Sequence, residues 1–311
     1  MVKVWIDCDM GYDDLVAVLM LASAPEIEIA GLSLVAGNAP LPQVIENTQN
    51  AAAFFSWDFP LFAGRDRPVL GPLETAGYVL GDTGIRTSGR SLPATTRRPM
   101  GHAVNGMVDF IEENPGATIL ALGPLSNLAG LLLVRPDLAE QIGRLVWMGG
   151  SLGPGNHSAA AEYNAAADPV AVQMVLESGV AFAMVGLDAC RQVSLIAADL
   201  AVLRGKAGEK AQMLADLTQG YLAIASADLS KPMSWYDPTA AAAVLDPACI
   251  EWRPAHITME TGEGPARGMT VVETRVPPHA SPRKQVNAQV AGTVEAQKVR
   301  TLIARALEAS C

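Results

Sequence analysis

Residues 2–15, VKVWIDCDMGYDDL, place four carboxylates within the first fourteen residues of the chain. The apolar residues before them predict a buried strand that ends near Cys8. Gly11 then predicts a tight turn, and the apolar spacing that begins at Leu15 predicts a helix with Asp13 and Asp14 at its N-terminus. The chain therefore begins with a strand–turn–helix unit that carries an acidic cluster at its turn.

The acidic cluster poses an electrostatic problem. Two carboxylates about 4 Å apart repel each other by about 4 kcal/mol at an effective dielectric constant near 20. A helix N-terminus stabilises each anion beside it by only about 0.3–1 kcal/mol. The cluster therefore needs protons or a cation, and a hard divalent metal bound through oxygen meets that need.

The composition indicates a folded protein and argues against two classes of partner. The chain has 311 residues, of which half are hydrophobic and 17% are charged. This length suits one large α/β domain or two modest ones, and the composition argues against disorder. The net charge is −10, from 22 basic and 32 acidic residues. Without a basic stripe, neither nucleic acid nor an anionic membrane is an expected partner.

The cysteines and the N-terminus indicate a reducing compartment. The four cysteines are far apart and form no CxxC pair, which excludes a zinc-ribbon or thioredoxin motif. They are Cys8, Cys190, Cys249 and Cys311. The first residues run directly into the predicted strand without a signal-peptide pattern, and no apolar stretch is long enough to cross a membrane. We expect a cytoplasmic protein.

Short apolar runs alternate with helical patterns through about residue 190. Strands are predicted at 2–8, 28–36, 117–122, 143–148 and 181–187, and helices at 14–23, 41–56, 101–113, 125–133 and 168–178. This alternation predicts an α/β fold with an open, mainly parallel, Rossmann-like sheet and helices on both faces. Ligands of such sheets bind beyond the carboxyl ends of the strands, where the acidic run lies.

The remaining segments are less regular. Residues 64–100 are predicted to form a long irregular connection, 192–235 to be helical and 251–292 to form strands. No internal repeat and no clear linker is present. We expect a single domain that spans residues 1–311.

Several later segments place polar residues after apolar runs, as the opening segment does. They are VAGN at 35–38, ALGPLSN at 121–127, MGG at 148–150, AEYN at 161–164 and WYDP at 235–238. Each is weak alone, because Asn38 is typical of a turn, and Ser126 with Asn127 is typical of a helix cap. Asp168 before Pro169 is also typical of a helix start.

Taken together, these segments resemble the inosine–uridine-preferring nucleoside hydrolase family. The resemblance runs from Val4 to the segment that begins at Asn287. The opening family motif, DxDPGxDD, is matched by Asp7, Asp9, Gly11, Asp13 and Asp14. Met10 replaces the family proline, which changes the stiffness of the turn but removes no ligand.

The resemblance implies a Ca²⁺-dependent hydrolase that cleaves the N-glycosidic bond of ribonucleosides or related N-ribosides. The implied calcium ligands are Asp9, Asp14, Asp237 and the backbone carbonyl of Leu122, and Asp9 is also the implied general base. The residues implied to hold the ribose are Asp13, Asn38, Asn156, Glu162 and Asn164, with Asp7 behind them. This chemistry suits carboxylates, because cleavage passes through an oxocarbenium-like state. The resemblance also implies a homodimer or homotetramer.

The chain departs from the family on the side of the leaving base. Tyr236 replaces a histidine that precedes the distal aspartate in many members, and Leu80 corresponds roughly to a second histidine. Tyr236 is therefore a candidate catalytic residue, although a phenol with a pKa near 10 is a weak acid. Trp235 or Tyr78 could stack on the base, or Trp235 and Tyr236 could simply be packing aromatics.

The four histidines and one cysteine leave further possibilities open. His157 could reach the mouth of the site, and His102 could cap or pack at a helix start. His256 lies in a predicted strand and His279 in a proline-rich loop. Cys190 could approach the site but is expected to be structural.

Two other functions remain open at this point. A degenerate family member would bind ribosides without useful turnover. A haloacid-dehalogenase-like phosphatase would use Asp7 and Asp9 as its DxD motif, but it needs a downstream lysine and a further acidic pair, for which the chain has few candidates. That phosphatase would release phosphate in a magnesium-dependent manner.

Overall fold

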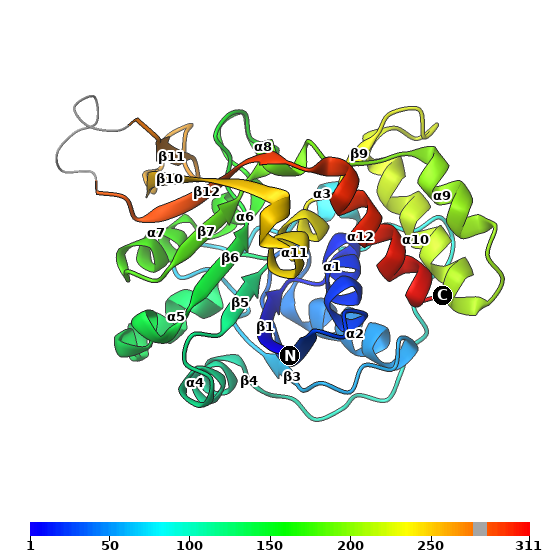
Figure 1. Ribbon diagram of the computed structural model, residues 1–311, viewed down its shortest axis with the longest axis horizontal. Helices are drawn as coiled ribbons and strands as arrows, with labels where there is room; N and C mark the ends of the chain where they lie inside the picture. The colour runs from blue at the N-terminus through cyan, green and yellow to red at the C-terminus, as the bar shows by residue number, and fades with distance from the viewer. Residues whose placement is uncertain (276–284) are drawn as a thin grey trace.

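Ten strands form one sheet in the part of the chain that the computed structural model describes, residues 1–275 and 285–311 (Figure 1). The strand order is β11-β10-β12-β7-β6-β5-β1-β2-β3-β4. The pairings from β12 to β4 are parallel, whereas β10 is antiparallel to both β12 and β11. The predicted α/β fold with a mainly parallel sheet is confirmed.

The strands and helices alternate along most of the chain. The strands of the sheet are β1 (Val2–Cys8), β2 (Ile27–Leu34), β3 (Leu61–Ala63), β4 (Gly101–His102), β5 (Thr118–Ala121), β6 (Arg144–Met148), β7 (Phe182–Val185), β10 (Ile250–Met259), β11 (Thr270–Glu273) and β12 (Ala288–Val294). The α-helices are α1 (Tyr12–Ala22), α2 (Leu41–Phe54), α3 (Gly77–Leu80), α4 (Ala103–Glu113), α5 (Ser126–Val134), α6 (Tyr163–Ala167), α7 (Pro169–Glu177), α8 (Leu187–Cys190), α9 (Ala197–Arg204), α10 (Glu209–Ala225), α11 (Asp237–Leu245) and α12 (Ala296–Ala309). A two-stranded ribbon joins β8 (Ser194–Leu195) to β9 (Met233–Ser234), and short 3₁₀ helices span Pro136–Gln141 and Pro247–Cys249.

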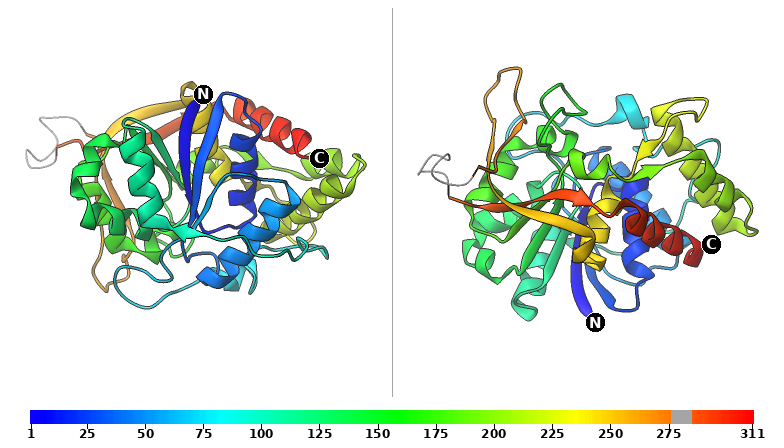
Figure 2. Two further views of the ribbon diagram at one scale, coloured as in Figure 1. Left: turned by 90° about the horizontal axis from the view of Figure 1, so that it is seen from below. Right: turned by 45° about the horizontal axis from the view of Figure 1, so that its top comes forward.

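Two hydrophobic layers cover the two faces of the sheet. The ribbon views in Figure 2 show the helices that lie on either side of it. Along β1, Val4 and Ile6 belong to the layer that contains α1, α11 and α12, while Trp5 belongs to the layer that contains α4, α5 and α7. The alternation follows from the two-residue period of a strand. Burying one such large apolar side chain contributes about 1.5–3 kcal/mol, so both layers favour this register of β1.

The parallel strands bring distant segments to one edge of the sheet. The residues that follow β1, β2, β5 and β6 all leave the sheet at its carboxyl edge, because neighbouring parallel strands run in the same direction. Asp9, Asn38, Leu122 and Gly150 lie in these four connections. The polar motifs that are separated in sequence are therefore gathered by the sheet.

Most of the predicted elements agree with the structure within a few residues. The helix predicted at 101–113 is preceded by β4, and the 64–100 connection contains α3. The 192–235 segment is not wholly helical, because β8 and β9 flank α9 and α10. Helix α12 was not predicted, nor were β3, α6 and α8, whereas α11 begins at Asp237 before Pro238, a pair that is typical of a helix start. The strands predicted over 251–292 correspond to β10, β11 and β12, but residues 276–284, including His279, lie outside the described residues.

No helix among the described residues combines the length and the apolar character needed to cross a bilayer.

Candidate active site

A cavity of about 300 Å³ lies at the carboxyl edge of the sheet. The predicted site residues that line it are Asp9, Asp13, Asn38, Leu122, Asn156, Glu162, Asn164, Tyr236 and Asp237. Two predicted residues are not in its lining: Asp14, which is fully buried beside it, and Trp235. Its volume is at the lower end of the range of small-molecule sites.

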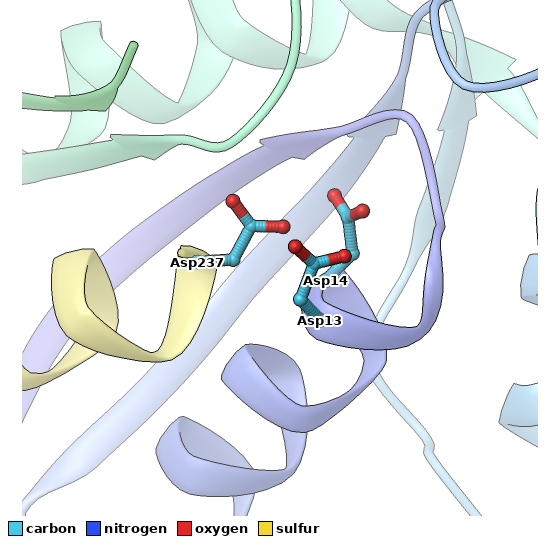
Figure 3. A group of neighbouring side chains, drawn as sticks. All are labelled: Asp13, Asp14 and Asp237. Carbon is cyan, nitrogen blue, oxygen red and sulfur yellow. The ribbon is translucent and has the colours of Figure 1, made fainter. Parts of the chain in front are cut away.

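Three carboxylates meet at this cavity from two elements that are far apart in sequence (Figure 3). Asp13 and Asp14 stand in the first turn of α1, and Asp237 is the first residue of α11. One oxygen from each lies within 4.8 Å of the other two. This grouping differs from the predicted ligand set, since it contains Asp13, which was expected on the ribose, and does not contain Asp9.

Asp14 carries an acceptor that the protein leaves unpaired. Its Oδ2 accepts hydrogen bonds from the backbone N–H of Gly11 at 2.7 Å and from Asn38 Nδ2 at 3.3 Å. Its Oδ1 is buried and has no hydrogen-bond partner. A buried carboxylate oxygen without a partner is costly, so this atom and its two carboxylate neighbours fit a hard cation bound through oxygen.

Asp9 is held beside this group by the neighbouring connection. Its Oδ2 accepts a hydrogen bond of 2.7 Å from the backbone N–H of Asn38, and its Oδ1 accepts one of 3.1 Å from Asn38 Nδ2. Gly37 permits this approach, because a Cβ there would lie 2.1 Å from Asp9 Oδ2. The Asn38 side chain thus bridges Asp9 and Asp14.

Burial shifts the titration of all four carboxylates. The pKa of Asp14 rises from 3.8 to about 7 and that of Asp13 to about 6, chiefly through loss of solvation. The pKa values of Asp9 and Asp237 are raised well above the usual range by burial and then by neighbouring carboxylates. The metal-free cluster therefore favours protons at neutral pH, and a divalent cation would reverse that preference.

The turn between β1 and α1 is strained at the position that departs from the family motif. Met10 has φ of 37°, in the left-handed region that non-glycine residues rarely adopt, and its side chain is buried in the core. Proline fixes φ near −65°, so this backbone would not accept it. Core packing of Met10 holds the turn instead.

Asp7 lies behind the cluster, as predicted. It accepts hydrogen bonds from Ser33 Oγ and from Asn127 Nδ2, the latter at 2.8 Å. Burial raises its pKa to about 7. Asn127 also accepts a hydrogen bond from the Arg65 backbone, so it joins the β1 end to the 64–100 connection rather than capping α5.

Glu162 and Asn164 build the wall of the cavity on the side of β6. The Glu162 carboxylate accepts hydrogen bonds from the backbone N–H groups of Gly150, Asn164 and Ala165 and so caps α6. Burial raises its pKa to about 7. Asn164 Nδ2 donates to the Leu122 carbonyl at 2.7 Å. That carbonyl retains a second lone pair, as the predicted metal contact requires.

Asn156 stands at the mouth of the cavity beside His157. Its Oδ1 accepts a hydrogen bond of 2.9 Å from the backbone N–H of Tyr163, and both Asn156 and His157 line the cavity. His102 and His256 do not line it.

Trp235 and Tyr236, the two aromatic residues before Asp237, lie in different surroundings. Tyr236 lines the cavity, and burial raises its pKa to about 12. Trp235 is buried in the core, where its ring stacks on Tyr221 at 5.5 Å. The expected contact of Trp235 with a base is therefore corrected to core packing beneath Tyr221. Cys190 is also buried and directs its thiol to the carbonyl of Tyr236.

The structure adds cavity residues that the sequence motifs did not indicate. Tyr221 lines the cavity from α10 and donates a hydrogen bond of 3.1 Å to Asp13 Oδ2. Tyr163 also lines it and donates to the Gly37 carbonyl at 2.6 Å. The AEYN motif contains Tyr163 and could have indicated it, whereas Tyr221 lies in a helical pattern that resembles any packed helix.

The chain matches the family model described as inosine-uridine preferring nucleoside hydrolase over residues 4–301. The chain belongs to this family. It is 30% identical to the pyrimidine-specific ribonucleoside hydrolase RihB of Escherichia coli (strain K12). The aligned 275 residues cover 87% of each chain. The predicted family and the predicted reaction class, hydrolysis of an N-glycosidic bond, are confirmed. The phosphatase interpretation does not fit this membership.

Solved structures agree with the assignment. The plant nucleoside hydrolase PpNRh1 superimposes with a TM-score of 0.90 at 26% identity and covers 98% of both chains. The purine-preferring ribonucleoside hydrolase from Gardnerella vaginalis superimposes with a TM-score of 0.88 at 25% identity, covering 99% of this chain and 98% of that one. The nucleoside hydrolase fold therefore spans nearly the whole chain.

Proposed function

We propose that this hydrolase cleaves ribonucleosides or closely related N-ribosides to free base and ribose, with Ca²⁺ held in the acidic cluster. The observation that carries the proposal is the meeting of Asp13, Asp14 and Asp237 at the cavity, with Asp14 Oδ1 buried and unpaired. Carboxylate oxygens are the ligands that Ca²⁺ prefers. The same cavity is lined by amide and carboxylate side chains, which can form hydrogen bonds with a polyhydroxylated ligand.

The residues that would hold Ca²⁺ are Asp9, Asp14, Asp237 and the carbonyl of Leu122, with Asp13 close enough to join them. When bound, the ion would lower the pKa of a water molecule and neutralise the charge of the cluster. Without a compensating cation, burial and the neighbouring carboxylates would favour protonation of Asp9, and a protonated Asp9 could not serve as the base.

Asp9 is the proposed general base. Its two hydrogen bonds from Asn38 fix the orientation of its carboxylate at the cavity. During attack on the anomeric carbon, Asp9 accepts a proton from the attacking water. Negative side chains around the sugar also stabilise the positive charge that develops as the glycosidic bond breaks.

Asp13, Asn38, Asn156, Glu162 and Asn164 are the proposed ribose contacts. Much of the hydrogen-bonding capacity of Glu162 and Asn164 is engaged within the protein, so their orientations are set before a sugar binds. Such a preorganised site rejects an analogue that lacks a hydroxyl, because buried polar groups are then left unpaired. We therefore expect selection against 2′-deoxynucleosides.

The relatives differ in their printed base preferences, pyrimidine-specific for one and purine-preferring for another. The substrate panel should therefore contain inosine, adenosine, guanosine, uridine and cytidine, together with 2′-deoxyinosine and 2′-deoxyuridine. Release of base and of reducing sugar is followed with added Ca²⁺ or with chelator. We expect turnover of ribonucleosides that chelation abolishes and Ca²⁺ restores.

Two variants sharpen this test. Asp9→Asn should still bind a riboside but lose about 10²–10⁴-fold in turnover, the usual contribution of a general base. Asp109→Asn, on the exposed face of α4, is the matched control and should retain full activity. Riboside binding without release of base from any substrate would support the alternative of a degenerate binding protein. Unchanged turnover by Asp9→Asn would remove Asp9 as the base.

We also propose a single domain over residues 1–311, a homodimer or homotetramer, and a cytoplasmic location. Strand β1, near the start of the chain, and strand β12, near its end, belong to one sheet, which supports the single domain. Free cysteines at positions 8, 190, 249 and 311 are consistent with a reducing compartment. Light scattering after size exclusion measures the oligomeric state, and a monomer would contradict the proposed assembly.

A further inference from the structure

One part of the cavity lining is rich in apolar and aromatic groups rather than carboxylates. Its members are Tyr78, Val79, Leu80, His157, Ile224, Met233 and Tyr236. An apolar wall suits a planar aglycone, but breaking the glycosidic bond leaves negative charge on that group unless it receives a proton. Tyr236 stands where many family members have a histidine before the distal aspartate, so the group that supplies the proton has to be found among the other residues of the lining.

Three phenols in the lining are poorly suited to donate a proton. Tyr221 donates its hydroxyl to Asp13 and to the carbonyl of Ser234, and Tyr163 donates its hydroxyl to the carbonyl of Gly37. Burial raises the pKa values of both phenols. The third, Tyr236, is a phenol, whose ordinary pKa near 10 makes it a weak acid at neutral pH. An effective general acid has a pKa much nearer to the working pH.

His157 is the imidazole in the lining, and no other described histidine lines the cavity. Its Nδ1 lies 3.1 Å from the hydroxyl of Tyr78, and its Nε2 lies 4.0 Å from a carboxylate oxygen of Glu74. Its ring also meets the edge of the Tyr163 ring, with centroids 5.9 Å apart. Imidazole has the one unperturbed side-chain pKa that lies between pH 5 and 8.

The loop that carries His157 is held by its own hydrogen bonds. The backbone N–H groups of Asn156 and His157 both donate to the carbonyl of Ala161, at 3.2 and 3.1 Å. Arg191 donates to the carbonyls of Pro154 and Gly155. The imidazole is therefore placed by a fixed loop, which is what a proton donor at a defined position requires.

We propose that His157 is the catalytic acid that protonates the leaving aglycone, with Tyr78 and Glu74 as positioning residues. The inference rests on the proposed function, since it assigns a step of that reaction. The Tyr78 hydroxyl accepts a hydrogen bond from Nδ1–H and so keeps that proton on Nδ1, while the Glu74 carboxylate stabilises the imidazolium. Nε2 lies beyond hydrogen-bond distance of Glu74, so its proton is available to a ligand.

The proposed step balances without an external reactant. The electron pair of the breaking carbon–nitrogen bond passes to the aglycone, and the Nε2 proton of His157 is transferred to it. The oxygen of the attacking water bonds to the anomeric carbon, and Asp9 accepts its proton. Exchange with solvent then returns a proton to His157 and removes one from Asp9, so that the site is reset.

The test compares two substrates of the holoenzyme in Ca²⁺. A natural ribonucleoside needs protonation of its base, whereas 4-nitrophenyl β-D-ribofuranoside has a leaving group that is stable as an anion. We expect His157→Gln to lose about 100-fold or more in kcat on the nucleoside and less than about 3-fold on the nitrophenyl riboside. Tyr78→Phe should also lose kcat on the nucleoside and not on the nitrophenyl riboside. Its loss should be smaller, about 10-fold, because the acid remains but its tautomer is less well fixed.

His102→Gln is the matched control, since His102 is exposed and does not line the cavity. Its rates on both substrates should equal those of the wild type. An equal loss on both substrates for His157→Gln would overturn the acid role, as would no loss on either. If Tyr236→Phe shows the split instead, Tyr236 is the acid. A wild-type protein inactive on both substrates would overturn the hydrolase function itself, which is a distinguishable result.

Discussion

Replacing Asp14 by asparagine should stabilise the metal-free protein and remove most of the stabilisation that Ca²⁺ gives to the wild type. Asp14 is fully buried, and its Oδ2 accepts the Gly11 backbone N–H that starts α1. An asparagine keeps that acceptor, because its amide oxygen can take the same position. Its amide nitrogen would replace Oδ1, which has no partner and lies in the group formed with Asp13 and Asp237. The variant therefore removes a charge and supplies a donor.

The magnitude follows from the pKa of Asp14. Burial raises this pKa from 3.8 to about 7, which corresponds to about 4 kcal/mol against the folded state once both states are ionised. At pH 8, above both values, that cost is fully present in the metal-free wild type. Asp14→Asn removes it, so the metal-free variant should be more stable than the wild type by a few kcal/mol.

Added Ca²⁺ should reduce or cancel this advantage. Ligand binding to the folded state alone stabilises by about 2.7 kcal/mol at a hundred times Kd and by about 4.1 kcal/mol at a thousand times. The wild type should gain this stabilisation, and the variant, which lacks one ligand, should gain little. Each protein is then measured against its own metal-free form.

Urea unfolding at pH 8, followed by circular dichroism with chelator or with Ca²⁺, measures the four free energies. Asp109→Asn, which changes an exposed carboxylate, should stay within about 0.5 kcal/mol of the wild type in both conditions. A metal-free Asp14→Asn that is less stable than the metal-free wild type would refute the reasoning. So would a variant that gains as much from Ca²⁺ as the wild type.

Two further predictions follow from the same site. In chelator, the stability advantage of Asp14→Asn over the wild type should grow as pH rises from about 4 through about 7. The reason is that ionisation of a carboxyl with a raised folded-state pKa destabilises the folded protein. An advantage that does not change between pH 4 and 8 would contradict this. Gly37→Ala should lower kcat by about 100-fold, since its Cβ would lie 2.1 Å from Asp9 Oδ2 and displace the proposed base. Gly130→Ala on α5, where the nearest atom is 3.8 Å from the added Cβ, is its control and should leave kcat unchanged, whereas equal rates for both variants would show that the position of Asp9 is not critical.

Local patterns in the sequence were enough to predict the parallel core of the sheet and the acidic turn. Alternation of Val4, Trp5 and Ile6 between two faces is a local property of a strand, and Asp13 and Asp14 in the first turn of a helix follow from the apolar spacing after them. Charge repulsion among neighbouring carboxylates likewise needs no tertiary structure, so the demand for protons or a cation was visible from residues 7–14 alone.

Long-range packing determines which side chains meet at the site and which are buried in the core, and local patterns do not reveal this. Trp235 and Tyr236 are adjacent in sequence, yet one is buried against Tyr221 and the other lines the cavity. Asp13 joins Asp14 and Asp237 because α11 begins beside the first turn of α1, a contact between elements more than two hundred residues apart. The Tyr78–His157 pair arises in the same way, because the short helix α3 and the irregular segment before α6 meet at the cavity. Local sequence determines on which side of its own helix or strand a side chain lies. Long-range packing determines which other residues that side chain contacts.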